Sequence, residues 1–155
     1  MEKAYGKGGQ AVDIYTTING VLVKLFRDVM HLEEKAVITG EFKDITNNDM
    51  HIIEVVGIDE PKNMSTVAKE LSVTVGTLTI AMNSLVKKGY VTRVRSEKDR
   101  RVVLLSLSEK GKEAYNHHKE FHRKMVESTI ERLSGEEKEV LVKALQNLYQ
   151  YFQEL

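Results

Sequence analysis

The chain has 155 residues, 41% hydrophobic and 30% charged, with one proline and no cysteine. This length and composition fit a single domain with a core of its own. The 23 basic and 23 acidic residues cancel, so net charge does not identify a partner. The lack of cysteine excludes disulfides and thiolate metal sites, and the apolar runs are too short to span a membrane. No secretion leader opens the chain, so we expect a cytoplasmic protein.

The first part of the chain predicts a loose end and two helices. Residues 1–10 are rich in glycine and predict a disordered N-terminus. Over residues 11–34, apolar side chains recur at steps of three or four, as they do on one face of a helix. Thr46 can cap a second, short helix that Gly57 closes.

A pair of short helices is predicted next. Asn63 or Ser65 can cap a helix through Leu71. Thr74 can cap another, which Gly89 ends. Two helices joined by so few residues are typical of a helix-turn-helix.

A hairpin and two further helices complete the chain. Residues 90–95 show the two-residue period of a strand, and a polar turn leads to a second β-rich run over 102–107. Helices are predicted from Ser108 to about residue 133 and over 136–154. The predicted fold class is mainly α with a small β-hairpin, in the order of a winged helix-turn-helix.

Positive charge is concentrated in the segment that ends the helix pair and forms the hairpin. Between Lys87 and Arg101 lie seven basic and two acidic residues, which leaves this segment at +5 in a neutral chain. Such a concentration favours binding to phosphates.

The second helix of the pair is expected to enter the major groove of double-stranded DNA. At 100° per residue, one face is apolar and is expected to pack inward, formed by Val75, Leu78, Met82, Leu85 and Val86. The predicted DNA-binding residues of this helix are Thr74, Gly76, Thr77, Thr79, Ile80, Asn83, Ser84 and Lys87. Ile80 has two interpretations: it contacts a thymine methyl group, or the helix is rotated and it packs inside.

The hairpin tip supplies the other predicted DNA contacts, which are Lys98, Asp99, Arg100 and Arg101. The basic side chains can meet phosphates or enter a narrow minor groove. Asp99 is not suited to touch an anion, and we expect it to orient a neighbouring arginine.

Several motifs together resemble the MarR family of bacterial transcription regulators. They are Val67-Ala68-Lys69-Glu70-Leu71, Thr77-Leu78-Thr79, Leu85, Lys88-Gly89-Tyr90-Val91, Arg93, Asp99-Arg100-Arg101, residues 105–107 and Ser108-Glu109-Lys110-Gly111. The resemblance implies one domain over 11–155, with dimerisation helices at 11–34 and 108–155 and a DNA-binding lobe at 46–107. It also implies a MarR-like homodimer on a pseudo-palindromic operator. Many family members carry a basic residue where this chain has Ile80.

Other segments resemble the FabT branch of that family, the repressors of fatty-acid synthesis genes. They are Phe42-Lys43-Asp44-Ile45, Met50-His51, residues 73–77, 89–103 and 118–122, and Asn147-Leu148-Tyr149-Gln150. The resemblance implies no required cofactor and a co-repressor that is a long-chain acyl group on acyl carrier protein. Its chain would lie in an apolar tunnel, for which the candidate residues are Leu25, Phe26, Val29, Met50, Ile53 and Phe121.

The histidines support an alternative function, metal sensing. His118 and His122 are four residues apart on one helix face, and His51 could approach them. Glu33, Glu34 and Glu54 are possible further ligands, and zinc-sensing family members use histidines at comparable places. An enzyme is not expected, because the chain lacks a phosphate-binding glycine loop and a nucleophile elbow.

Overall fold

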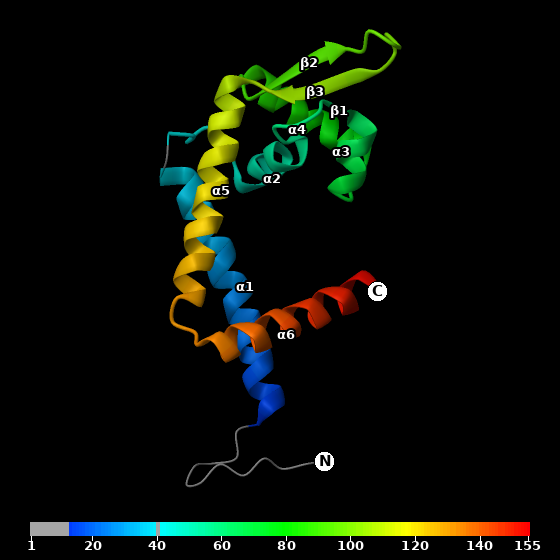
Figure 1. Ribbon diagram of the computed structural model, residues 1–155. Coiled ribbons are helices and arrows are strands. Elements are labelled where there is room, and N and C mark those ends of the chain that lie inside the picture. The colour runs from blue at the N-terminus through cyan, green and yellow to red at the C-terminus, as the bar shows by residue number, and fades with distance from the viewer. Residues whose placement is uncertain (1–12, 40) are drawn as a thin grey trace.

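The computed structural model describes residues 13–39 and 41–155, which form six helices and one three-stranded antiparallel sheet (Figure 1). The elements are α1 (Ile14–Thr39), α2 (Asn47–Val56), β1 (Lys62–Asn63), α3 (Met64–Glu70), α4 (Val75–Lys87), β2 (Val91–Arg95), β3 (Val103–Leu107), α5 (Glu109–Ile130) and α6 (Gly135–Gln153). The predicted fold class is confirmed. The predicted disordered segment 1–10 lies outside the described residues, as does the predicted helix start at 11.

Element boundaries differ from the predicted ones at three places. α1 continues to Thr39 rather than residue 34, because neither proline nor glycine occurs between residue 34 and Gly40. α5 ends at Ile130. β1 was not predicted: its two residues are too short to show a period, and they pair with Leu104 and Leu105 of β3, giving the sheet order β1-β3-β2.

The chain has two parts, which α5 connects. α2, α3, α4 and the sheet form a lobe at the N-terminal end of α5 (Figure 1). α1 runs beside α5, and α6 turns away from its far end. None of the helices in the described residues combines the length and the apolar character that crossing a membrane requires.

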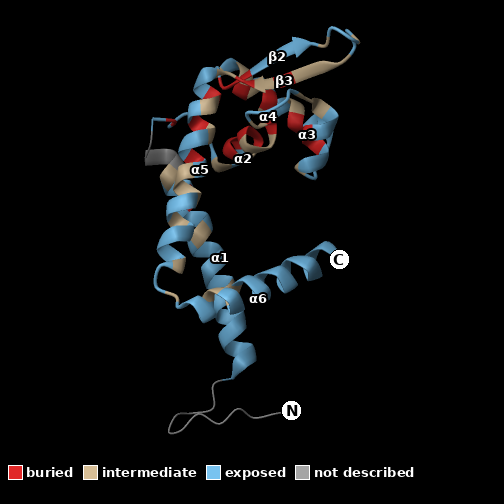
Figure 2. Ribbon diagram, in the orientation of Figure 1, coloured by how far each residue is buried: buried red, intermediate tan, exposed pale blue. Residues whose placement is uncertain are grey.

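The core lies in the lobe and at the start of α5, as the buried residues in Figure 2 show. Its members are Phe42, Ile45, Met50, Ile52, Ile53, Val56, Val67, Ala68, Leu78, Met82, Leu85, Tyr90, Val91, Leu105, Leu107 and Ala114. By contrast, α6 buries no residue, and apolar side chains such as Phe26 of α1 and Phe152 of α6 are exposed. An apolar surface of this extent marks a contact with another molecule.

Side-chain caps start five of the helices, four of them at a predicted cap, whereas the cap at Ser134 was not predicted. Thr46 and Ser134 form full capping boxes with Asp49 and Glu137. Asn63, Thr74 and Ser108 cap α3, α4 and α5; of the two predicted caps of α3, the structure uses Asn63 rather than Ser65. Each cap satisfies a backbone N–H that the helix itself cannot satisfy.

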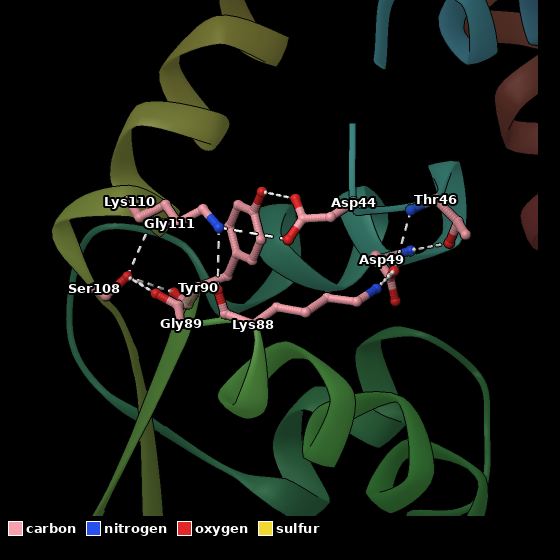
Figure 3. Close-up of polar contacts among 9 residues, drawn as sticks. All are labelled: Asp44, Thr46, Asp49, Lys88, Gly89, Tyr90, Ser108, Lys110 and Gly111. Atoms are coloured by element: carbon pink, nitrogen blue, oxygen red, sulfur yellow. Dashed lines mark hydrogen bonds and ion pairs between the residues drawn. The ribbon is translucent and has the colours of Figure 1, made fainter. Parts of the chain in front are cut away.

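The start of α5 is locked against the end of α4 (Figure 3). Ser108 Oγ donates to the carbonyl of Gly89 over 2.5 Å and accepts the N–H of Gly111 over 3.0 Å. The backbone of Gly111 lies so close to Tyr90 that a Cβ atom there would be 2.1 Å from the Tyr90 carbonyl oxygen. Glycine is therefore required at 111 for close approach.

Polar contacts hold Tyr90 from its other side (Figure 3). The Tyr90 ring is buried, and its hydroxyl donates a hydrogen bond to Asp44 Oδ1 over 2.5 Å. Lys110 Nζ lies 4.1 Å from the ring centroid. Burial and the Asp44 carboxylate raise the pKa of Tyr90, and the hydrogen bond from Tyr90 lowers the pKa of Asp44. Tyr90 thus stays a neutral donor at physiological pH, and it ties β2 to the segment before α2.

We expect Gly111→Ala to lower the free energy of unfolding by about 1–3 kcal/mol, because the new methyl group meets a backbone carbonyl that cannot move aside cheaply. Denaturant unfolding followed by circular dichroism measures this. Gly135→Ala is the matched control, since nothing lies within 4 Å of its Cβ. Equal stability of the two variants would contradict the packing argument.

Candidate nucleic-acid interface

α4 has one buried and one exposed face. Leu78, Met82 and Leu85 are buried as predicted. Val75 is 44% exposed, so its predicted inward packing is wrong: it is the first residue of the helix and lies one turn before the first buried contact. Val86 is only half-buried.

The opposite face of α4 carries most of the predicted DNA-binding residues. Thr74, Gly76, Thr77, Ile80, Asn83 and Lys87 are exposed, and Thr79 and Ser84 are half-buried. Ile80 is 76% exposed, so the interpretation that it packs inside is wrong. A large apolar side chain in the middle of a polar, exposed face is available to contact an apolar group of a partner.

Threonines organise the N-terminal turn of α4. The Thr74 hydroxyl oxygen accepts the N–H of Thr77 over 3.1 Å, and the two hydroxyl oxygens are 2.9 Å apart. Thr79 donates its hydroxyl proton to the carbonyl of Val75 over 2.7 Å, so its side chain is left as an acceptor. Thr77 is therefore the better placed of these hydroxyls to meet a base or phosphate.

Asn83 is held from outside the helix. Arg93 of β2 donates from Nη1 to Asn83 Oδ1 over 2.7 Å. Arg93 was not predicted as a site residue, although it lies in the cationic segment and at an alternate position of the predicted strand. The contact joins the helix to the hairpin.

The hairpin extends beyond the core. Val91 is the one buried residue of β2, and Val94 is 61% exposed, so the alternation of the strand does not produce a buried face along its length. The strand leaves the lobe after Val91, and the hairpin projects from it (Figure 1). In this β2–β3 hairpin, the wing, β2 is thus solvated beyond Val91, whereas β3 keeps Leu105 and Leu107 in the core.

At the tip of the wing, Asp99 orients Arg101. Asp99 Oδ1 accepts the backbone N–H of Arg101 over 3.0 Å and Nε of the same residue over 3.2 Å. The expectation that Asp99 orients a neighbouring arginine is confirmed. The Arg101 side chain is still 92% exposed, and Lys98 and Arg100 are exposed beside it. Their charges are available to an anionic partner.

The six residues predicted to line an apolar tunnel lie in different surroundings. Met50 and Ile53 are buried in the lobe core, whereas Leu25 and Phe26 are exposed on α1. Val29 of α1 and Phe121 of α5 are half-buried. The tunnel stays a prediction.

A hollow of roughly 400 Å³ lies elsewhere, at the junction of α1 and α2. It is lined by Arg27, Met30, His31, Glu34 and Asn47. The Oδ1 atom of Asn47 is buried without a hydrogen-bond partner. Met30 is the one apolar residue among the five, and the others are polar or charged.

Three helices bring the predicted histidines together with two glutamates. His118 Nε2 lies 3.0 Å from His122 Nε2 and 3.3 Å from Glu54 Oε1. Glu33 Oε1 of α1 is 3.3 Å from His122 Nε2, and His51 Nδ1 is 3.2 Å from the Glu54 carboxylate. This histidine–glutamate cluster, formed by these five residues, joins α1, α2 and α5.

One face of the cluster has the geometry of a metal site. The ligand atoms of Glu33, His118 and His122 lie within 4.8 Å of one another. His118 is 1% exposed and Glu33 6% exposed, so both are withdrawn from water. Imidazole nitrogens with a carboxylate are a ligand set that suits zinc and similar ions. Of the predicted carboxylates, Glu33 lies at this face, and Glu34 lines the hollow instead.

Burial lowers the pKa of His118, and the nearby His122 and His51 add to this, whereas the Glu54 and Glu33 carboxylates oppose it. The unfolded chain binds a proton here near pH 6.5, and the folded chain only at lower pH. We therefore expect the free energy of unfolding to fall as the pH drops below about 6.5. Denaturant titrations between about pH 7.5 and 5.5 in chelator measure it.

In that experiment we expect His118→Gln to flatten the pH dependence. His117→Gln is the matched control, because that neighbouring histidine is exposed and outside the cluster. A His118→Gln variant with the wild-type pH dependence would contradict the assignment.

Three comparisons place the chain among known proteins. The family model "Transcriptional regulator SarA/Rot" matches residues 35–118. The uncharacterised HTH-type transcriptional regulator YwhA of Bacillus subtilis is 26% identical over 133 residues, which cover 86% of this chain and 93% of that protein.

Solved structures of regulators and related proteins resemble the chain as well. Streptococcus pneumoniae FabT in complex with DNA is 46% identical, with a TM-score of 0.86 over 90% of this chain and 98% of that one. A MarR family protein from Bacillus stearothermophilus shares the fold, with a TM-score of 0.76 at 18% identity over 94% and 99% of the two chains. These relatives are regulators, which confirms the expectation that the chain is not an enzyme. The chain belongs to the MarR family of winged helix-turn-helix transcriptional regulators.

Proposed function

We propose that this protein is a homodimeric repressor that binds double-stranded DNA. The observation that carries the proposal is the exposed polar face of α4 beside a solvated wing that ends in an oriented Arg101. In this arrangement α4 enters the major groove and the wing reaches the adjacent minor groove. The 46% identity to FabT, which was solved in complex with DNA, supports this assignment.

Charge favours the same surface. The +5 segment from Lys87 to Arg101 includes the end of α4, strand β2 and the tip of the wing. Lys88 is partly neutralised by Asp49, 3.3 Å away, whereas the wing-tip cations point to solvent. Phosphate contacts from these cations displace condensed counterions, so binding weakens steeply with salt.

Exposed apolar side chains on two helices support the proposed dimer. α1 and α6 show apolar side chains such as Ile18 and Leu145 to solvent, each more than half exposed. A second copy of the chain covers these helices in the proposed assembly. Its two α4 helices then meet half-sites about 34 Å apart on a pseudo-palindromic operator.

The proposed targets are genes of fatty-acid synthesis, with a long-chain acyl group on acyl carrier protein as co-repressor. The support is the identity to FabT together with the segments that resemble that branch. No cofactor is required in this proposal. The co-repressor acts by binding the DNA-competent form of the dimer more tightly than the incompetent form.

The histidine–glutamate cluster supports a second candidate function, a response to a transition metal. Glu33 comes from α1, and His118 and His122 come from α5. A metal ion bound by these residues fixes the two helices relative to each other, and so the direction in which the lobe faces. DNA affinity would then depend on the metal.

We expect Thr77→Ala to weaken binding to an operator by about 1–3 kcal/mol and to have little effect on a random duplex, because a base contact is lost. Arg101→Ala is the contrasting variant: we expect it to weaken every duplex and to reduce the salt dependence, because it removes a phosphate or minor-groove contact. Fluorescence anisotropy at two salt concentrations measures both. Equal losses on operator and random duplex would assign Thr77 to the DNA backbone instead.

The effector is tested by anisotropy on a fatty-acid-synthesis promoter, alone, with long-chain acyl-carrier protein, and with zinc followed by chelator. We expect the acyl carrier to tighten binding and zinc to leave it unchanged. Binding that depends on zinc, and is lost in His122→Ala but kept in His117→Ala, would replace the lipid signal by the metal signal. A response to neither would remove both effectors and leave the DNA-binding proposal standing.

A further inference from the structure

A hydrogen bond links α4 and the wing, the two parts of the proposed DNA interface. Arg93 of β2 donates from Nη1 to Asn83 Oδ1 of α4 over 2.7 Å, and both residues are exposed. Among the ion pairs between described residues, none includes Arg93. Its hydrogen-bond partner is therefore a neutral amide rather than a carboxylate. The guanidinium can hold the amide while its positive charge, which no carboxylate among the described residues neutralises, stays available to DNA.

The chemistry of the pair fixes the orientation of the amide. A guanidinium group only donates hydrogen bonds, so the amide atom that faces Arg93 is the oxygen. The Asn83 NH₂ group consequently points away from Arg93. An asparagine that reads adenine needs both groups, its oxygen for N6 and its NH₂ for N7. Arg93 occupies one of the two lone pairs of Oδ1 and fixes the plane of the amide, so the group that Asn83 turns freely toward the DNA is its NH₂ donor.

We propose that Arg93 is a positioning residue that sets the base preference of Asn83. By holding Oδ1 it directs Nδ2 toward major-groove acceptors, which are N7 of purines, O6 of guanine and O4 of thymine. Cytosine, which shows a donor at N4, is disfavoured at the contacted position. This inference rests on the proposed DNA-binding function and adds a determinant of sequence specificity to it.

The experiment selects bound sequences from a random duplex pool with the full-length protein. Affinities of each variant are then measured on the selected site and on its single-base-pair variants. The variants are Arg93→Ala, Asn83→Ala, the double substitution and Arg95→Ala. Arg95 is the matched control, because it is an exposed arginine two residues further along β2. Circular dichroism shows that each variant is folded.

We expect Arg93→Ala to shift one base-pair position per half-site toward adenine by about five-fold or more, because the released amide can rotate until both its oxygen and its NH₂ group face adenine. Asn83→Ala and the double variant lose the preference at that position equally. Arg95→Ala weakens all duplexes alike and keeps the preference. The readout is a change of preference, which a merely electrostatic role of Arg93 would not produce.

Two results would overturn the inference in different ways. If Arg93→Ala keeps the wild-type base preferences, or changes them in the same way as Arg95→Ala, Arg93 does not position Asn83, and the DNA-binding proposal stands. If the wild-type protein enriches no motif from the pool, the sequence-specific function itself fails, and the inference fails with it.

Discussion

The close contact between Gly111 and the Tyr90 carbonyl is the constraint on which the rest of the structure depends. It lets the first turn of α5 pack directly on the segment between α4 and β2 (Figure 3). Ser108 strengthens this contact, because its hydroxyl caps α5 and also donates a hydrogen bond to the carbonyl of Gly89, which follows α4. The end of α4, the start of the wing and the start of α5 therefore meet at one closely packed corner.

The parts of the fold that local chemistry decides were predictable. Thr46, Thr74 and Ser108 each combine a capping side chain with an apolar pattern behind it, and each starts a helix. The exposed face of α4 was also predictable, because a helix has a fixed period. Ile80 was the doubtful member, and only the packing of α4 against the lobe decided its direction.

Features that depend on long-range pairing were not predictable. β1 exists only because β3 is beside it, so its two residues carry no signal of their own. The Arg93–Asn83 contact needs the distance between a strand and a helix, which periodicity does not supply. The apolar tunnel stays a prediction. The sequence does not show that Met50 lies in the core while Leu25 faces solvent, because the two side chains have the same apolar character.

α5 has a mechanical consequence for regulation. It is one helix of 22 residues with no proline, hence about 33 Å long, and it is anchored to the lobe at one end and to the turn before α6 at the other. A rod of that length converts a tilt of about 5° into a displacement of about 3 Å, close to the step between stacked base pairs of about 3.4 Å. His118 and His122 lie near the middle of this helix, so a displacement of the helix at the histidine–glutamate cluster is roughly doubled at the end that carries the lobe.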